Sequence, residues 1–195
     1  LPYHRSSLSK TFLSSEAAEP ARWVLDAAGY DKLGIEVRTG VAVTSVQPSC
    51  QRLCIGAQEE IAYGQLLLAT GASAQRLEIP GVGLAGIHRL HNLAEAQALR
   101  ASALKASRVV VIGGSFVGLE VATALRQRGL SVTLIEQGAL LESLALPEFS
   151  AHLRAKLGQQ GVELVLGDAP LLWQIYPQDD GAHGPKLDAW LDRKS

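Results

Sequence analysis

The stretch from Arg108 to Glu120 reads RVVVIGGSFVGLE, and it decides the fold. It opens with a short apolar run typical of a buried strand, continues with a glycine turn at Gly113 and Gly114, and ends in helix-forming residues. This is the pattern of a strand, turn and helix that hold a dinucleotide, except that Ser115 stands at the position of the middle glycine. The stretch therefore predicts a dinucleotide-binding turn with one altered position.

Each position of this turn has its own physical task. Gly113 permits the tight bend, and Gly118 lets the helix pack closely on the strand. Ser115 narrows the approach of a pyrophosphate, but its hydroxyl can donate a hydrogen bond, and the N–H groups at the start of the helix still face an anion. We therefore expect nucleotide binding by Gly113, Gly114, Ser115, Phe116, Val117 and Gly118.

The acid at the end of the following strand indicates which nucleotide binds. The strand SVTLIE ends in Glu136, about 18 residues after Gly118 and close to the roughly 20-residue offset at which an acid binds the ribose 2′-OH. A carboxylate there would repel a 2′-phosphate, and no arginine follows in EQGALLES. We expect NADH to be preferred over NADPH.

Three helices are predicted around this turn. One opens at Asn92, with Glu95 in capping-box spacing, and leads into the strand that starts at Arg108. The second covers 116–128 and ends at Gly129. The third begins at Pro147 and runs to about Gln160, and its stop is a glycine. Each helix is therefore bounded by residues that favour its ends.

Strand signals alternate with these helices. The apolar runs 108–112, 131–136 and 162–166 predict three strands, and their order with the helices is βαβαβ. This order indicates an α/β fold, one half of a doubly wound parallel sheet. A separate apolar strand is expected at Ile61–Ala69, closed by a Thr-Gly turn.

Bulk composition limits the class of protein. The chain has 195 residues, 47% hydrophobic and 19% charged, with a formal net charge of −1, which is typical of a globular protein and does not suggest a nucleic-acid partner. No apolar run approaches the roughly 18 residues of a membrane span, and no signal-peptide core is evident. We expect a cytoplasmic protein, and the absence of methionine is compatible with a sequence that begins inside a longer chain.

The two cysteines, Cys50 and Cys54, form a C-x3-C pair. In extended backbone their Cα atoms would be roughly 13 Å apart, too far for a disulfide, although a tight turn could bring them closer. Zinc needs more ligands than this pair offers, and no histidine has a matching spacing. We expect two buried structural thiols and no metal site.

Four motifs in order carry a resemblance to a known family: LPYHRSSLSKTFL, YGQLLLATGAS, GVGLAGIHRLHNLAEAQAL and VVVIGGSFVGLEVATAL. Together they resemble the FAD-dependent pyridine nucleotide-disulfide oxidoreductases, in particular ferredoxin and rubredoxin reductases, from Leu1 to about Gly167. The resemblance implies a partial FAD-binding domain at 1–88, an inserted NAD(P)H-binding domain at 89–168 and a divergent tail at 169–195.

The resemblance also implies roles for single residues. Lys10 would lie near the reactive N5 edge of the flavin, and Glu120 would meet the nicotinamide and pair with Lys10, so these two form the expected catalytic pair. A lysine there stabilises the anionic flavin that hydride arrival produces, and the carboxylate holds it in place. The further positions implied for FAD are Arg5, Val43, Ala69, Thr70, Gly71 and His91.

The chain departs from the family pattern in several places. RSSLSK stands where the family has RPPLSK, which removes two stiffening prolines, and His91 replaces a common arginine. The glycine turn that holds the ADP of FAD would lie before Leu1. We therefore expect the isolated chain to carry no stoichiometric FAD and to bind NADH weakly at best.

The resemblance implies a reaction that needs no thiol relay, because the chain has no C-x4-C redox pair. We expect NADH to give hydride to FAD, and the flavin to pass electrons to a ferredoxin, rubredoxin or Rieske-type iron–sulfur protein. Two alternatives remain open. One is a redox-sensing flavoprotein similar to apoptosis-inducing factor, and the other is a truncated, non-catalytic NAD-binding fragment.

Overall fold

The computed structural model describes residues 1–15, 22–56, 59–74, 78 and 80–167, together with the backbone of two later strands. The chain divides into two compact units. The first unit contains Leu1–Tyr3 and Arg22–Ser73, and the second contains His4–Ala21 and Ala74–Ser195. The predicted dinucleotide turn belongs to the second unit.

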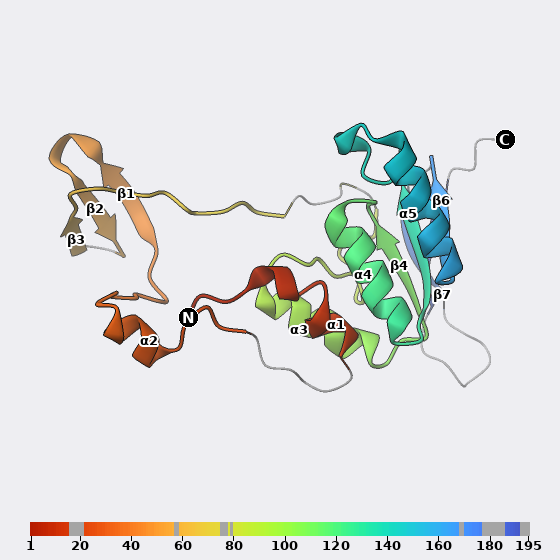
Figure 1. Ribbon diagram of the computed structural model, residues 1–195, viewed down its shortest axis with the longest axis horizontal. Helices are drawn as coiled ribbons and strands as arrows, with labels where there is room; N and C mark the ends of the chain where they lie inside the picture. Colours follow the sequence, from red (N-terminus) through yellow and green to blue (C-terminus); the bar gives the residue numbers. More distant parts are fainter. Residues whose placement is uncertain are drawn as a thin grey trace. The chain divides into compact units, whose positions relative to one another are not determined.

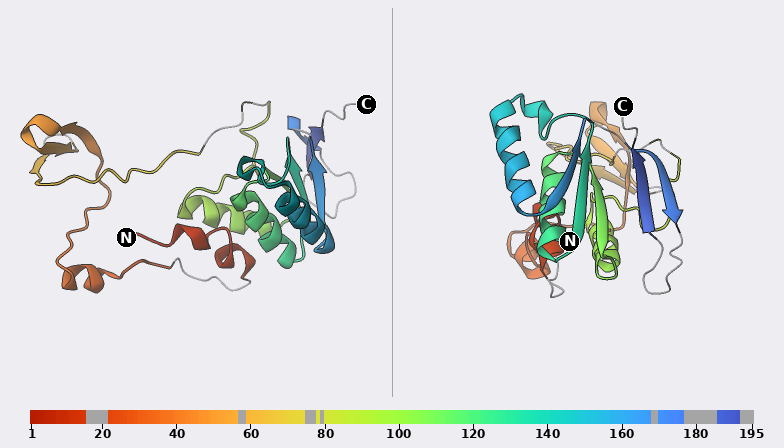
Figure 2. Two further views of the ribbon diagram at one scale, coloured as in Figure 1. Left: turned by 45° about the horizontal axis from the view of Figure 1, so that its top comes forward. Right: turned by 90° about the vertical axis from the view of Figure 1, so that its right-hand side faces the viewer.

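A parallel sheet forms the centre of the second unit (Figure 1). Its strands are β4 (Arg108–Ile112), β5 (Ser131–Glu136) and β6 (Val162–Leu166), in that spatial order. The helices α4 (Phe116–Gln127) and α5 (Pro147–Gln159) connect them and cover one face of the sheet, as the two views of Figure 2 show. The predicted βαβαβ order and the parallel sheet are confirmed.

The residues that end these helices act as the sequence predicts. Ser115 is the N-cap of α4, and Gly129 follows its C-cap with a φ of +84°, a conformation that glycine adopts without steric cost. Pro147 occupies the first turn of α5, where its missing N–H is no loss. Local residue choice therefore fixes where each crossover helix starts and stops.

The helix α3 (Leu93–Ala103) precedes β4. Its N-cap Asn92 accepts a hydrogen bond from the N–H of Glu95 at 2.9 Å, as the capping-box spacing predicts. The Glu95 carboxylate accepts from the N–H of His91 at 2.7 Å, one residue before the N-cap. The reciprocal contact thus forms one position earlier than in the standard box.

The core of the second unit lies around its central strand. Val132, Leu134 and Ile135 of β5 are at most 2% exposed, and Leu125 of α4 is fully buried. Burying one such side chain contributes about 1.5–3 kcal/mol relative to leaving it in water. Leu13 joins this group of fully buried side chains from a segment more than a hundred residues earlier in the sequence. The N-terminal segment around Leu13 is therefore part of the second unit's core.

Short elements complete the second unit. They are η1 (Arg5–Ser7), α1 (Thr11–Ser14), η3 (Glu142–Leu144), β7 (Pro170–Tyr176) and β8 (Lys186–Leu191). The strands β7 and β8 pair antiparallel as a two-stranded sheet. Within the part of the chain that the structure describes, no helix is long and apolar enough to cross a membrane.

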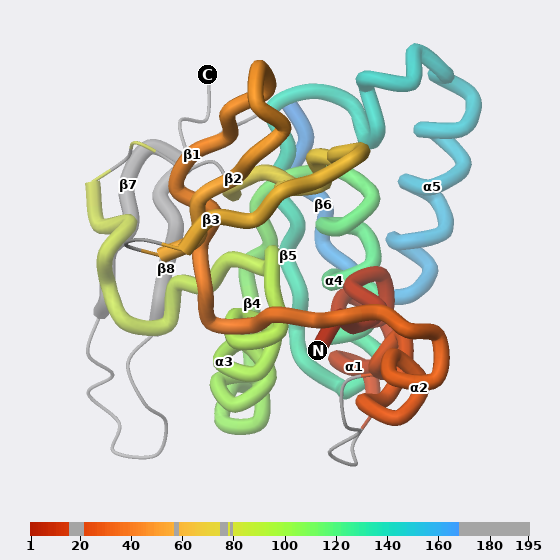
Figure 3. The backbone as a smooth tube through the Cα atoms, turned by 90° about the vertical axis from the view of Figure 1, so that its left-hand side faces the viewer, coloured from red at the N-terminus to blue at the C-terminus, as the bar shows by residue number. Residues whose placement is uncertain are grey.

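The first unit is built on a small antiparallel sheet. Its strands β1 (Val43–Gln47), β2 (Arg52–Ile55) and β3 (Glu59–Ala62) follow one another in space, as the tube in Figure 3 traces. The turn η2 (Pro48–Cys50) joins β1 to β2, and the helix α2 (Ala27–Lys32) precedes the sheet.

The predicted strand at Ile61–Ala69 is wrong in its extent. The strand β3 ends at Ala62, and residues 63–73 form no strand. Leu67 and Leu68 are 87% and 67% exposed. An apolar run gains stability as a strand only where other strands and a covering layer bury it, and no described strand pairs with 65–69.

The prediction of two buried thiols is also wrong. Both cysteines are free, but Cys50 is exposed and Cys54 is only half-buried. Cys50 lies in the turn between β1 and β2, with its thiol against the side chain of Gln47, and a hairpin tip offers nothing to cover it. The tight turn considered for the pair does form and connects β1 to β2, but the two cysteines form no disulfide.

Candidate functional site

Two residues far apart in the sequence form an ion pair in the second unit. The Lys10 ammonium Nζ lies 2.9 Å from the Glu120 carboxylate oxygen Oε1. The Glu120 side chain is 29% exposed and that of Lys10 is 52% exposed, so water only partly screens the pair. The expected contact between Lys10 and Glu120 is therefore present, and the roles expected of the two residues stay predictions.

A third residue completes the cluster, and sequence reasoning missed it. The Ser9 hydroxyl donates to Glu120 Oε2 at 2.5 Å, within the range of charge-assisted O–H···O⁻ bonds. Ser9 itself is 5% exposed. Each oxygen of the carboxylate therefore has its own donor. The one signal in the sequence was the position of Ser9 directly before Lys10.

These contacts set the charge state of Glu120. Partial burial raises the pKa of its carboxyl, but the hydrogen bonds from Ser9 and Lys10 and the charge of Lys10 together outweigh it. The net result is a Glu120 pKa below its ordinary value. Glu120 is therefore ionised at neutral pH, which keeps the Lys10 ammonium bound.

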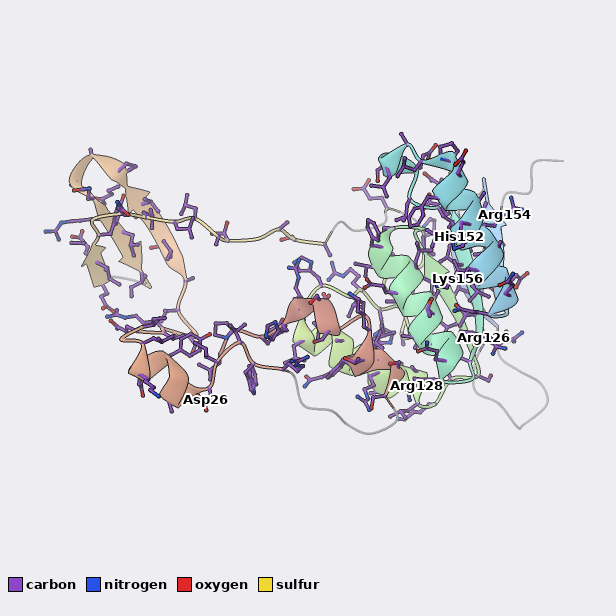
Figure 4. The ribbon with its side chains drawn as sticks, in the orientation of Figure 1. Asp26, Arg126, Arg128, His152, Arg154 and Lys156 are labelled. Atoms are coloured by element: carbon purple, nitrogen blue, oxygen red, sulfur yellow. The ribbon has the colours of Figure 1, made fainter. Side chains whose placement is uncertain are left out.

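Arginines hold the segment that carries Lys10. Arg100 of α3 is buried and donates to the carbonyl oxygens of Phe12 at 2.9 Å and Ser15 at 3.0 Å. Arg128, labelled beside the end of α4 in Figure 4, donates to the carbonyl of Leu13 at 3.2 Å. The last carbonyls of a helix need such donors, so these bonds fix α1 against α3 and α4.

The glycine turn is closed tightly against α4 and β5. A Cβ built on Gly118 would lie 1.9 Å from the carbonyl oxygen of Gly113, and one on Gly114 would lie 2.9 Å from the Cγ of Glu136. Gly113 has a φ of +106°, which side chains disfavour. All three glycines are therefore required by geometry, as the sequence pattern indicated for the first and third positions.

Ser115 has a role that sequence reasoning did not assign. Its hydroxyl oxygen accepts from the N–H of Gly118 at 3.5 Å, which makes it the N-cap of α4. An accepting hydroxyl keeps its own proton, so Ser115 can still donate to a phosphate at the same time. The side chain is exposed at the start of the helix.

Glu136 lies directly on the glycine turn. Its carboxylate accepts from the N–H of Gly114 and, at 3.1 Å, from the N–H of Gly138. These two bonds hold the acid at the carboxyl end of β5, beside the N-terminus of α4. In parallel sheets, ligands bind outside this end of the strands.

These residues fit the pyrophosphate and ribose of a dinucleotide. The first N–H groups of α4 have no partner within the helix and can face an anion. Phe116 and Val117, also expected to bind nucleotide, occupy the first turn of α4 and are 56% and 46% exposed.

A groove of about 550 Å³ lies alongside the ion pair. It is lined by residues of α1, α4 and α5, among them Lys10, Glu120, Phe116, Phe149 and Lys156. Figure 4 labels Lys156, with His152 and Arg154, along α5. Apolar and charged side chains both line the groove, a mixture typical of small-molecule sites.

The remaining expected FAD residues are divided between the two units. In the second unit, Arg5 is exposed in η1, and His91 is half-buried just before the N-cap of α3. In the first unit, Val43 is 57% exposed in β1. Ala69, Thr70 and Gly71 are exposed and belong to no strand. Among the described residues, no group of three His, Cys, Asp or Glu side chains could hold a metal ion.

Comparison with known proteins identifies a family. The family described as pyridine nucleotide-disulphide oxidoreductase matches residues 1–179. The chain is 39% identical over 163 residues to the biphenyl dioxygenase system ferredoxin–NAD(+) reductase component of Paraburkholderia xenovorans, covering 83% of this chain and 40% of that protein. It is 37% identical over 162 residues to the rubredoxin–NAD(+) reductase of Pseudomonas putida, covering 83% and 42%. The chain thus spans about two fifths of the length of these curated relatives.

Solved structures show the same fold. The ferredoxin reductase for the CYP199A2 system of Rhodopseudomonas palustris matches with a TM-score of 0.82 and 28% identity, over 96% of this chain and 46% of that one. The reductase complexed with putidaredoxin matches with a TM-score of 0.82 and 26% identity, over 98% and 47%.

Proposed function

The chain belongs to the pyridine nucleotide-disulphide oxidoreductase family, and from that premise we propose that it is part of an NADH-dependent flavoprotein reductase. In this reductase, hydride passes from NADH to FAD and electrons pass on to a ferredoxin-like iron–sulfur protein. The observation that carries the proposal is the Lys10–Glu120 ion pair, which joins the N-terminal segment to the helix of the nucleotide turn.

The pair has a clear chemical task in such a reductase. FAD, when bound, accepts a hydride and releases single electrons. Lys10 places a positive charge where negative charge develops, and Glu120 keeps the ammonium oriented before the reaction, so no reorganisation is needed when it occurs. The bonds from Arg100 and Arg128 to the carbonyls of α1 keep the lysine segment from moving away from α4.

We assign the nucleotide turn to NADH rather than NADPH. The N-terminus of α4 would hold the pyrophosphate, and Ser115 would donate to it. Glu136, fixed by the N–H groups of Gly114 and Gly138, would bind the ribose 2′-OH and repel a 2′-phosphate.

We assign the flavin to residues 1–88 and the pyridine nucleotide to residues 89–168, followed by a divergent tail at 169–195. The proposed FAD contacts are Arg5, Lys10, Val43, Ala69, Thr70, Gly71 and His91. The exposure of Arg5, Val43, Thr70 and Gly71 leaves them free to contact a ligand. His91 contacts Glu95 through its backbone N–H, which leaves its ring available.

The proposed acceptor is a small iron–sulfur protein. The similar reductases are named for ferredoxin and rubredoxin, and one related structure is a complex with putidaredoxin. The sequence has no C-x4-C redox pair, so electrons would leave the flavin directly.

Anaerobic stopped-flow reduction tests the proposal, using the complete protein that the gene encodes, loaded with FAD. We expect Lys10→Ala to slow flavin reduction by NADH about 10²-fold, the order found for loss of one preorganised electrostatic group. Lys105→Ala, which removes an exposed lysine just after α3, is the control and should leave the rate unchanged. An equal rate in Lys10→Ala and the unmutated protein would contradict the role of Lys10.

The same assay tests which nucleotide is preferred and whether the protein is a reductase or a redox sensor. NADH should be preferred over NADPH, and Glu136→Ala should reduce that preference. Equal kcat/KM for the two nucleotides in the unmutated protein would overturn the assignment of Glu136. Slow reduction without steady turnover to a ferredoxin would favour the redox-sensing alternative.

A further inference from the structure

We propose that Ser9 is a positioning residue for the ion pair. Its hydroxyl holds the Glu120 carboxylate in the orientation in which the other oxygen meets Lys10. The importance of this for electron transfer rests on the proposed function above. The orientation of Glu120 itself does not, because it depends only on contacts within the second unit.

Each oxygen of the Glu120 carboxylate contacts a different donor. Oε2 accepts from the buried Ser9 hydroxyl, and Oε1 accepts from the Lys10 ammonium. A carboxylate held at both oxygens cannot rotate freely about its last bond. Ser9 and Lys10 are adjacent in the chain, so the segment that presents the lysine also fixes the acid that holds it.

The ion pair alone does not fix this geometry. The Lys10 side chain is 52% exposed and its ammonium also donates to the carbonyl of Ser6 at 3.3 Å. Ion pairs of this exposure are weak and are screened by salt. The Ser9 bond is short, and its donor is neutral and belongs to a buried residue, so salt weakens it less than the charge attraction.

Ser9 and Lys10 are the two described residues whose side chains contact the Glu120 carboxylate, one at each oxygen. The groove beside Glu120 contains one further cation, Lys156 of α5, among its lining residues, and Lys10 already occupies Oε1. Removal of the Ser9 hydroxyl takes away the donor that Oε2 has in this structure, and the carboxylate is then held at Oε1 alone.

Carbon-13 NMR of the chain labelled at glutamate Cδ tests the inference without any cofactor. The Glu120 resonance is assigned by its loss in Glu120→Gln, and its pKa is measured at low and at high salt. We expect Ser9→Ala to raise the pKa of Glu120 and to make it more sensitive to salt, because only the screened ion pair remains. Ser9→Thr, which keeps the hydroxyl, should stay closer to the unmutated chain.

Ser7→Ala is the matched control, because Ser7 lies in the same segment but donates to the carbonyl of His4 at 2.7 Å. A Glu120 pKa that moves no more in Ser9→Ala than in Ser7→Ala overturns the inference. If Ser9→Ala does not fold, Ser9→Cys takes its place, because a thiol is a weaker hydrogen-bond donor than a hydroxyl. The pKa of Glu120 should then be higher than in the unmutated chain, and an unmoved pKa overturns the inference.

A second arm uses the FAD-loaded complete protein. Ser9→Ala should move the acid limb of the NADH reduction rate to higher pH, since Glu120 would protonate more easily. An unmoved acid limb overturns the link to electron transfer. If even the unmutated protein shows no reduction by NADH, the proposed function fails while the NMR result for Ser9 still stands.

Discussion

The two units of this chain differ in how far their sheets are buried. In the second unit, the central strand β5 has parallel neighbours on both sides and carries Val132, Leu134 and Ile135, each at most 2% exposed. In the first unit, the strands β1, β2 and β3 pair along most of their length, with one irregularity between Val43 and Ser45, yet Ile55 is the one buried residue of these strands. Backbone pairing alone thus gives strands, but a core requires layers that cover them.

This difference predicts unequal stability within one chain. A small sheet without a covering layer is marginal in water, whereas a sheet covered by helices resists opening. The apolar run at 66–68 belongs to the first kind of region, because its leucines are 37% to 87% exposed. Substitutions matched across the two units should reveal the difference.

The largest contrast concerns leucines. Leu134→Ala should lower the free energy of unfolding of the second unit by about 2–5 kcal/mol, because it leaves a cavity in the core of the unit. Leu67→Ala should change stability by no more than about 0.5 kcal/mol, because that side chain is 87% exposed. Urea unfolding followed by circular dichroism measures both. Similar losses in the two variants would break the comparison.

A smaller contrast concerns glycines. Gly118→Ala would place a methyl group 1.9 Å from the carbonyl oxygen of Gly113, and the helix must shift to admit it. We expect a loss of about 1–3 kcal/mol, the usual cost of overpacking. Gly64→Ala in the first unit meets nothing within 4 Å and should be nearly neutral. Thermal unfolding of the two variants gives the answer, and a tolerated Gly118→Ala would show that the turn is looser than described.

Sequence reasoning predicted the second unit well because its signals are local. Gly129, Pro147 and Asn92 act within a turn of their own position, so each helix end could be placed from nearby residues. The strand predicted at Ile61–Ala69 failed because its fate depends on partners elsewhere in space. The prediction that Cys50 is buried failed for the same reason, because the burial of a turn depends on which other segments cover it.

Part of the candidate site could likewise be predicted from local sequence, and part could not. The glycine turn and Glu136 follow from spacing along one βαβ unit. The meeting of Lys10 with Glu120 came from family resemblance, because periodicity cannot bring residues together over such a distance. Ser9 carried no pattern of its own. A buried serine that serves one carboxylate becomes visible only when the fold places the two side by side.

Helix caps provide a third, finer contrast. Ser115→Ala removes the N-cap of the long helix α4 and should lower the free energy of unfolding of the second unit by about 1 kcal/mol. Asp26→Ala removes the acceptor of the Gly29 N–H, at 2.7 Å, from the short helix α2 of the first unit. Hydrogen exchange should show faster amide exchange in α2 alone for Asp26→Ala, and loss extending into β4 and β5 for Ser115→Ala. Loss confined to the first turn of α4 would contradict cooperative folding of the second unit.

The smallest expected effect is the pH dependence that Glu120 adds to the second unit. Its pKa is lowered in the folded chain, chiefly because the bonds from Ser9 and Lys10 outweigh the opposing effect of burial. A carboxyl with a lowered folded pKa stabilises the fold above its unfolded pKa, and that contribution disappears as the pH falls through the folded value.

The measurement compares the free energy of unfolding of the unmutated chain with that of Glu120→Gln. The difference should be largest near neutral pH, at about 1 kcal/mol or less, because solvent screens the half-exposed lysine. It should become smaller as the pH falls below the ordinary pKa of a glutamate side chain. High salt should reduce this difference only in part, because Ser9 donates from a buried position. A difference that stays constant from pH 7 to pH 3 would show that the carboxylate and its ion pair contribute nothing to the stability of the unit.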